Sequence, residues 1–157
     1  MAIESGNTAN RNFLFFQHFS TALKFFRILW PLPVTLIGLT LAVFIRGTNG
    51  CMQKHGIALE AFGGTASTIL WLMNPWATIQ AITLGHIIIA RDAATAEQLR
   101  AHEQVHVRQY ERWGFIFPIA YLAASVIAAL KGGDAYRNNV FEVEASAIKT
   151  NNVHSIR

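Results

Sequence analysis

An uninterrupted apolar run near the start of the chain constrains the fold more than any other feature. Residues 28–45 are eighteen residues without a charge, bounded by Arg27 and Arg46. A membrane-spanning helix needs about 17–25 mostly apolar residues, so this run predicts a transmembrane anchor. Pro31 and Pro33 stand near its start, where proline disturbs a helix least. A cleaved signal peptide is the alternative, but the run begins late and no small-x-small cleavage site is evident.

The composition also favours membrane contact. Hydrophobic residues make up 52% of the chain and charged residues only 14%, whereas about a quarter is usual. The net charge of +4 predicts basic flanks that meet anionic lipid headgroups. No basic run is interleaved with aromatic residues, so the sequence does not favour a nucleic-acid partner. The single cysteine, Cys51, excludes an intrachain disulfide, and a metal would have to be held by histidines and carboxylates.

The sequence divides into an N-terminal membrane segment, 1–46, and a following domain, 47–157. In the first, residues 13–27 mix phenylalanines with basic residues, which predicts an amphipathic helix at the membrane interface. In the second, residues 115–130 form another uncharged run that suits a core helix or an incomplete membrane insertion. Residues 57–79 fit either a buried helix or a re-entrant segment.

Three further elements are expected between and after these runs. Residues 81–90 are rich in β-branched side chains and predict a strand. Residues 95–113 predict a helix that a capping box at Thr95 begins and Gly114 ends. A last helix follows, with Asn138 or Asn139 as its N-cap.

A His-Glu-x-x-His motif lies in the middle of the helix predicted over 95–113. His102 and His106 are four residues apart, so their side chains share one helical face and can reach one metal ion. Glu103 is rotated about 100° from His102, which directs it to a water molecule on the ion rather than to the ion. Zinc lowers the pKa of such a water to about 7, and a carboxylate can then take its proton. The motif therefore predicts a zinc site with Glu103 as the acid/base of a hydrolysis.

A catalytic zinc needs a third protein ligand and one open position. Glu142 and Glu144, in the last predicted helix, are the candidates. They are two residues apart and point to different sides of a helix, so only one can be the ligand. His154 lies in a polar tail and is the weaker candidate. These two acids can also be explained without a metal, because the dipole at a solvated helix N-terminus favours acidic side chains.

The motif and the acidic helix together resemble a gluzincin metallopeptidase. In the membrane-bound branches of that clan, a Glu-x-x-Ala-Asp element supplies the third ligand. The resemblance places Glu142 at the ligand position and Ala145 at the alanine. The chain departs at Ser146, where the pattern has an aspartate that holds a ligand histidine; serine accepts such a hydrogen bond more weakly and without charge. The resemblance covers about residues 81–148.

The resemblance carries further implications for the site. In such enzymes the strand before the active helix binds extended peptide along its edge, which would assign that role to residues 84–90; an ordinary core strand is the alternative. Oxyanion support would come from a Tyr, His or Arg near the metal, and the sequence does not choose among Tyr110, Tyr136, Arg137 and His86. The chain is also similar to short bacterial proteins of no established activity that contain His-Glu-x-x-His followed by Gln-Tyr-Glu-Arg-Trp. We therefore expect it to be located in a bacterial inner membrane.

These features predict a mostly α, α+β chain with a membrane-anchoring helix and a minimal zincin-like unit of short strand, active helix and Glu-bearing helix. The predicted function is a membrane-associated zinc peptidase acting on a peptide or protein, with membrane lipid as a second partner. Zinc would be bound by His102, His106 and Glu142, and Glu103 would be the general base. The alternative is a non-catalytic membrane protein with a structural or degenerate metal site, or one with no metal. The sequence does not predict an oligomeric state.

Overall fold

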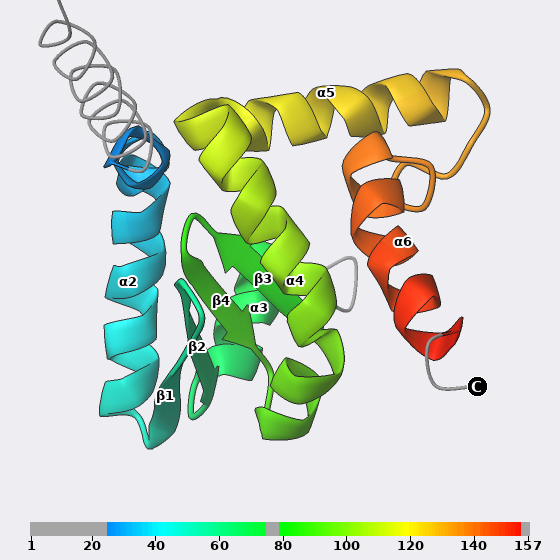
Figure 1. Ribbon diagram of the computed structural model, residues 1–157. Coiled ribbons are helices and arrows are strands. Elements are labelled where there is room, and N and C mark those ends of the chain that lie inside the picture. The colour runs from blue at the N-terminus through cyan, green and yellow to red at the C-terminus, as the bar shows by residue number, and fades with distance from the viewer. Residues whose placement is uncertain (1–24, 75–78, 155–157) are drawn as a thin grey trace, which may run out of the picture.

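The computed structural model describes residues 25–74 and 79–154, with side chains described up to residue 147. It is a mixed α+β structure in which helices cover both faces of a four-stranded sheet (Figure 1). The elements in chain order are α2 (Leu32–Gly47), β1 (Gly50–His55), β2 (Ala58–Gly63), α3 (Ala66–Met73), β3 (Ala81–Leu84), β4 (Ile87–Ala90), α4 (Ala93–Trp113), η1 (Gly114–Ile116), α5 (Phe117–Leu130) and α6 (Val140–His154). Most of the segment 13–27 lies outside the described residues.

The sheet has the strand order β1-β2-β4-β3. β1 and β2 form an antiparallel hairpin, β2 and β4 are parallel, and β4 and β3 are antiparallel. Between the first two strands and the last two, α3 provides the crossover that a parallel pair requires. β3 is therefore an edge strand, and it lies against α4.

The prediction of one strand over residues 81–90 is wrong. β3 and β4 form a tight hairpin, because Gly85 has a φ of +64° and turns the chain. A side chain at Gly85 would also come within 2.1 Å of Thr35 Oγ1, so only glycine fits there. β4 lies between two strands, so residues 87–90 have no free edge for an added peptide.

The apolar run predicted as an anchor forms α2 and the turn before it. One face of α2 packs on the sheet through Gly38, Ala42 and Ile45, which are buried with residues of α3 and of the strands. At Gly38 the approach is so close that an added Cβ would lie 2.8 Å from Ile87 Cβ. The opposite face exposes large apolar side chains, among them Ile37, Val43 and Phe44. The run is thus both part of the core and part of an apolar surface.

One helical run among the described residues, Ala93–Leu130, is long and apolar enough to cross a membrane, whereas α2 is apolar but shorter. The run joins α4, η1 and α5, and the chain turns at Gly114 so that α5 lies across the end of α4 (Figure 1). Gly114 has a φ of +61° and ends α4, as expected. The other face of α5 exposes Ile119, Leu122 and Leu130.

α4 lies between the sheet and α6, and this position determines where its histidines point (Figure 1). Val107 packs against Ala58 and Ile88 of the sheet face opposite α2. The N-cap of α4 is Asp92, whose carboxylate accepts from the N–H of Thr95, so the prediction of Thr95 as the cap is wrong by three residues. Asn139 caps α6 by accepting from the N–H of Phe141, which confirms one of the two expected caps.

Candidate metal centre

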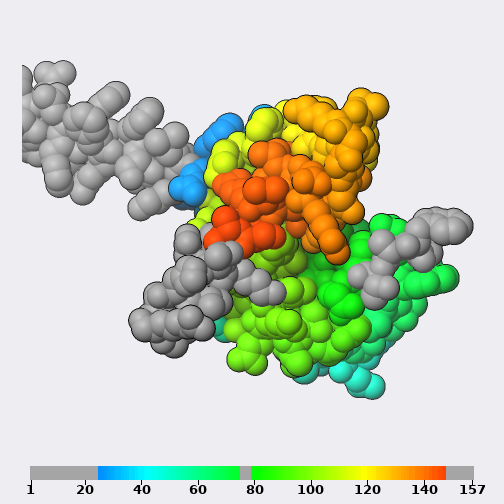
Figure 2. Space-filling view, turned by 90° about the vertical axis from the view of Figure 1, so that its right-hand side faces the viewer, coloured from blue at the N-terminus to red at the C-terminus, as the bar shows by residue number. Residues whose placement is uncertain are grey.

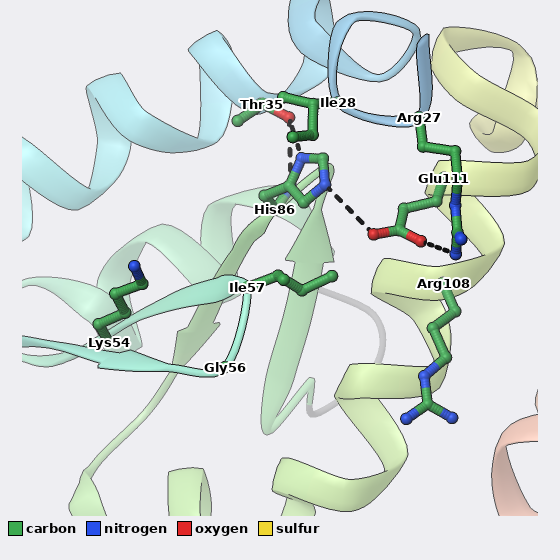
Figure 3. Close-up of a pocket in the computed structure, with 9 residues that line it drawn as sticks. All are labelled: Arg27, Ile28, Thr35, Lys54, Gly56, Ile57, His86, Arg108 and Glu111. Carbon is green, nitrogen blue, oxygen red and sulfur yellow. Dashed lines mark hydrogen bonds and ion pairs between the residues drawn. The ribbon is translucent and has the colours of Figure 1, made fainter. Parts of the chain in front are cut away.

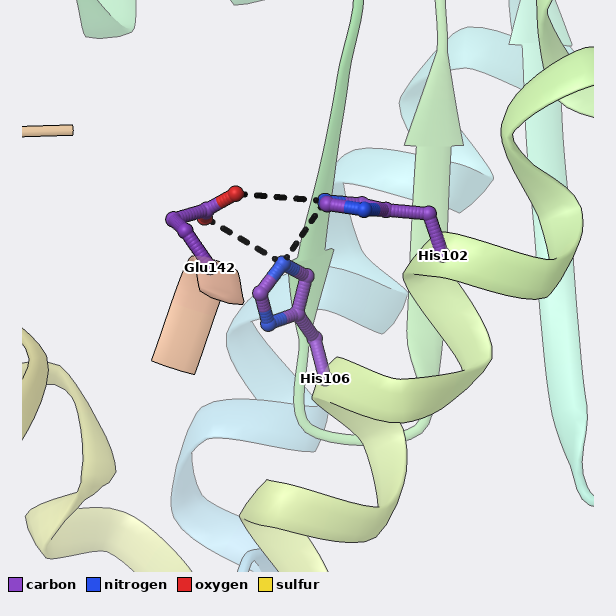
Figure 4. A group of neighbouring side chains, drawn as sticks. All are labelled: His102, His106 and Glu142. Carbon is purple, nitrogen blue, oxygen red and sulfur yellow. Dashed lines mark hydrogen bonds and ion pairs between the residues drawn. The ribbon is translucent and has the colours of Figure 1, made fainter. Parts of the chain in front are cut away.

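His102 and His106 project from one face of α4 toward the start of α6 (Figure 4). Their Nε2 atoms lie 3.2 Å apart, and the ring centroids are 4.8 Å apart. The stacking of positions i and i+4 on a helix produces this convergence, as the sequence predicted. Both rings are mostly buried, with 14% and 9% of the side chains exposed.

Glu142, in the first turn of α6, completes the group. Its Oε2 lies 3.3 Å from His102 Nε2, and its Oε1 lies 3.3 Å from His106 Nε2. One ligand atom from each of the three residues lies within 4.8 Å of the other two, so the group could hold a metal ion. In the space-filling view, α6 packs over α4 on this side of the molecule (Figure 2).

The donor set fits a metal better than it fits a closed hydrogen-bond network. Glu142 Oε2 is buried and accepts no hydrogen bond from the part of the chain that the structure describes, although His102 Nε2 is close. A buried carboxylate oxygen without a donor is costly, and a cation between the three side chains would remove that cost. Two imidazoles and one carboxylate are also a ligand set of catalytic zinc.

Gln109 orients His106. Its Oε1 lies 2.8 Å from His106 Nδ1, while its Nε2 donates to the carbonyl of Phe141 and to Glu144. Because the amide oxygen must accept, Nδ1 of His106 carries the hydrogen and Nε2 keeps its lone pair for a metal. Ser146, which stands where the gluzincin pattern has an aspartate, is exposed.

Tyr121 of α5 orients the carboxylate of Glu142. Its hydroxyl donates to Glu142 Oε1 at 2.7 Å. Asn139 also ties α5 to the start of α6, because its side chain donates to the carbonyl of Tyr121 and to Ser125. The position of Glu142 therefore depends on α5 as well as on its own helix.

Glu103 lies beside the three ligands and is nearly fully buried. Its Oε2 accepts from the hydroxyl of Thr83 on β3 at 2.7 Å, and no described residue donates to its Oε1. Burial raises the pKa of Glu103, against the lowering effect of His106, Thr83 and His102. Within the described residues, the carboxylate is therefore held at one oxygen only.

The charges of the three ligand residues depend on one another. Burial raises the pKa of Glu142, but its contacts with His102, His106 and Tyr121 outweigh that and hold the pKa well below its usual value. Burial lowers the pKa of His106, but Glu142 and Glu103 outweigh it, and the pKa is raised. Without a metal, the site therefore favours an ionised Glu142 beside a protonated histidine.

The structure separates the remaining sequence candidates for the site. Glu144 points away from the centre and pairs with Gln109 and Arg112, so Glu142 alone of the two acids joins the histidines. Tyr110 is buried against Phe117, with ring centroids 4.5 Å apart.

Of the other oxyanion candidates, Tyr136 is more than half exposed, in the segment before α6. Burial, Glu142 and Glu103 all raise the pKa of its hydroxyl. Arg137 is exposed in the loop before α6, and its N–H donates to Asp134. His86 belongs to a different cluster with Thr35 and Glu111. The side chain of His154 is outside those that the structure describes.

Three residues that orient the centre were missed by the sequence analysis. Gln109 follows His106 by three residues on the same helical face, and this spacing was the signal that could have identified it. Thr83 and Tyr121 carry no such signal, because only the packing of β3 and α5 brings them to Glu103 and Glu142.

Comparison of the chain with family models, with curated proteins and with solved structures gives no match.

Proposed function

We propose that the chain is a membrane-associated, zinc-dependent hydrolase that cleaves peptide bonds. The observation that carries the proposal is the convergence of His102, His106 and Glu142, with the free oxygen of Glu103 beside them. A solvated helix with incidental histidines would not direct three ligand atoms to one point.

The number of ligands supports a catalytic rather than a closed site. No fourth His, Cys, Asp or Glu joins the group within residues 25–74 and 79–147. Structural zinc sites have four protein ligands, whereas catalytic sites have three and an open position. Zinc held there would lower the pKa of a water molecule in that position to about 7 and polarise the carbonyl of a substrate.

Glu103 is the general base in this proposal. Thr83 holds one carboxylate oxygen, and the other accepts a proton from the attacking water. Burial raises the pKa of Glu103, which favours the return of that proton to the leaving amine. Tyr136 is our candidate for the donor that stabilises the developing oxyanion.

The membrane part of the proposal rests on exposed apolar side chains. Phe25, Phe26 and Leu29 are each more than half exposed, and so are several residues along α5. Trp30 joins the two groups by packing against Phe115, with ring centroids 5.0 Å apart. Monomeric soluble proteins rarely expose so much apolar surface in one place, and aromatic residues are enriched at membrane interfaces.

A structural metal site is the second candidate, and one observation favours it. Only 5% of Glu103 is exposed, and Thr83 occupies one of its oxygens, so the residue also fits a buried acid that supports the fold. A small domain can use zinc to hold its helices together. Here zinc would join α4 to α6.

The test compares zinc content with hydrolysis in the full chain, purified in nonionic detergent. We expect about one zinc per chain in the wild type and activity on a mixture of fluorogenic peptides. Glu103→Gln should keep the zinc and lose at least about 100-fold in rate, because general-base catalysis contributes about 10²–10⁴-fold. The matched control is Glu97→Gln, an exposed carboxylate on the same helix, which should change neither.

Two results would decide against the proposal. If Glu103→Gln keeps the full rate on a peptide that the wild type cleaves, Glu103 is not the base. If the wild type and Glu103→Gln bind zinc equally, neither cleaves any peptide, and removal of zinc lowers the melting temperature, the structural candidate is correct.

A further inference from the structure

A series of hydrogen bonds runs from His106 to the surface of α6. His106 Nδ1 lies 2.8 Å from Gln109 Oε1, and Gln109 Nε2 donates to Glu144 Oε2 at 2.9 Å. Arg112, near the end of α4, donates to Glu144 Oε1 at 3.1 Å. A buried imidazole of the metal centre is thus connected, through one amide, to a carboxylate that is not among the three candidate ligands.

The amide in the middle of this series has a fixed orientation. Gln109 is fully buried, and its Nε2 lies against two acceptors, the carbonyl of Phe141 and the carboxylate of Glu144. An amide turned the other way would place its oxygen against both acceptors, so the nitrogen stays on this side and the oxygen faces His106. Glu144 therefore helps to determine which ring nitrogen of His106 keeps its lone pair.

The carboxylate also brings a negative charge to the series. The side chain of Glu144 is 41% exposed and lies beside a guanidinium, so it is ionised at neutral pH. A carboxylate polarises an amide that donates to it, because hydrogen bonds in a series strengthen one another. The oxygen of Gln109 then accepts more strongly from His106 Nδ1. Such contacts raise the basicity of the other ring nitrogen, which is the one that would bind a metal.

The other buried histidine lacks this charge behind its ring. His86 Nδ1 also lies against an oxygen, the hydroxyl of Thr35, at 3.3 Å (Figure 3). That hydroxyl donates in turn to the backbone carbonyl of Pro31, so the series behind His86 leads to a neutral group. The series behind His106 leads to a carboxylate, which is the arrangement that strengthens an imidazole as a ligand.

A plain surface ion pair between Arg112 and Glu144 is the other explanation of these contacts. The two side chains are 59% and 41% exposed, and exposed pairs of this kind contribute little to stability. If the pair only joins α4 to α6, removing either partner should have the same small effect. If the charge of Glu144 acts on His106, the two partners should have different effects on a bound metal.

We propose that Glu144 is a positioning residue of the metal centre, which acts on His106 through the amide of Gln109 and strengthens the binding of zinc. Arg112 opposes this effect, because its positive charge attracts electron density away from the amide. The inference rests on the zinc site of the proposed function, but it does not require that the site catalyses hydrolysis.

The test is a zinc titration of the full chain in nonionic detergent against a competing chelator. Glu144→Gln keeps an acceptor for Gln109 but removes the charge. It should weaken zinc binding about three- to tenfold, at or below the low end of the range for groups outside the ligand set, because Glu144 is partly exposed. Arg112→Gln should keep the wild-type affinity or increase it. The matched control, Glu97→Gln, removes an exposed carboxylate of α4 and should change the affinity less than about twofold.

A double variant tests whether the effect passes through the amide. Gln109→Ala removes the amide, so adding Glu144→Gln to it should weaken zinc binding less than about twofold further. Melting temperatures of the metal-free proteins show whether each variant is folded. Because Glu144 and Arg112 lie at the surface, the comparison of their single variants is decisive even if Gln109→Ala does not fold.

Three results would overturn the proposal. If Arg112→Gln weakens zinc binding as much as Glu144→Gln does, the ion pair between the helices explains both. If Glu144→Gln has no larger effect than Glu97→Gln, the charge of Glu144 has no specific role. If Glu144→Gln has its full effect in the Gln109→Ala background, the charge does not act through the amide. These results leave the proposed function standing, whereas a wild type that binds no zinc would contradict both.

Discussion

Two buried histidines of this protein, His106 and His86, have similar contacts at Nδ1 but different neighbours at Nε2. His106 has its Nδ1 held by Gln109 and its Nε2 beside His102 and Glu142. His86 has its Nδ1 held by Thr35, and its Nε2 faces Glu111 alone, at 3.8 Å. In each case an oxygen fixes one ring nitrogen and directs the other toward a carboxylate.

The difference shows that a histidine beside a glutamate is not enough for a metal site. Around His106 three potential ligand atoms converge. Tyr121 orients the carboxylate of Glu142, and the amide of Gln109 orients the ring of His106. Among the described residues, His86 has one acid beside it, Glu111, and Arg27 already pairs with that acid. A guanidinium there competes for the carboxylate and repels a metal cation. The first centre therefore suits a metal, and the second suits an ion pair.

The largest expected effect comes from removing one histidine of each kind. His106→Ala takes away one of three ligands, so zinc affinity should fall by more than the 10–100-fold typical of changes outside the ligand set. His86→Ala is the matched control and should keep the full zinc content. Zinc titration against a competing chelator measures both. Equal losses would mean that the two sites are not distinct.

Gln109→Ala should have the next largest effect. The substitution leaves Nδ1 of His106 and the carbonyl of Phe141 without their partner, so we expect a 10–100-fold loss in zinc affinity. The unpaired buried groups should also cost about 1–3 kcal/mol each in the free energy of unfolding. Gln104→Ala, on the same helix and without a partner in the site among the described residues, should cost less than about 0.5 kcal/mol in the free energy of unfolding. Unchanged zinc affinity would show that Ser146 or another group orients His106.

The local part of the centre could be predicted from the sequence, because helix geometry alone relates His102 to His106. The third candidate ligand needed more information. The two-residue offset of Glu142 and Glu144 showed that only one of them could be the ligand, and the resemblance indicated which. Thr83 and Tyr121 could not be predicted, since nothing in their own segments indicates contact with residues about twenty positions away.

The fold shows the same limit. The residues of 81–90 predicted β structure correctly, but the turn at Gly85 was hidden because the sequence on both sides is rich in β-branched residues. For residues 28–45, hydropathy predicted a helix and could not distinguish lipid from a sheet as its neighbour. Gly38 decides this point, because it allows the helix to approach Leu84 and Ile87 closely. The role of Gly38 could not be predicted from the sequence, because it depends on the packing of α2 against the sheet.

Glu111→Gln tests the ion pair at the second site and should have a smaller effect. It removes the partner of Arg27, which is more than half exposed, so solvent screening limits the cost to about 1 kcal/mol in the free energy of unfolding. Zinc content should not change. Chemical denaturation of the wild type, of this variant and of the exposed control Glu97→Gln measures the cost. A loss of zinc would contradict the separation of the two sites.

The smallest effect is a change in the pH dependence of stability. Burial lowers the pKa of His86 below its usual 6.5, and Glu111 only partly opposes this. Between the lowered pKa and 6.5, the unfolded chain binds the proton more readily than the folded chain, so acidification destabilises the fold. This contribution is complete above pH 6.5 and is lost as the pH falls through the folded pKa, by at most about 1.4 kcal/mol per pH unit.

His86→Gln should remove that contribution. The difference in free energy of unfolding between pH 7.5 and pH 5.5 should be smaller in the variant than in the wild type, because the other histidines titrate alike in both proteins. Denaturant melts at the two pH values measure it. If the variant and the wild type show the same difference in free energy between the two pH values, His86 is protonated beside Glu111 in the folded protein. The pair of His86 and Glu111 would then resemble the protonated pair of His106 and Glu142.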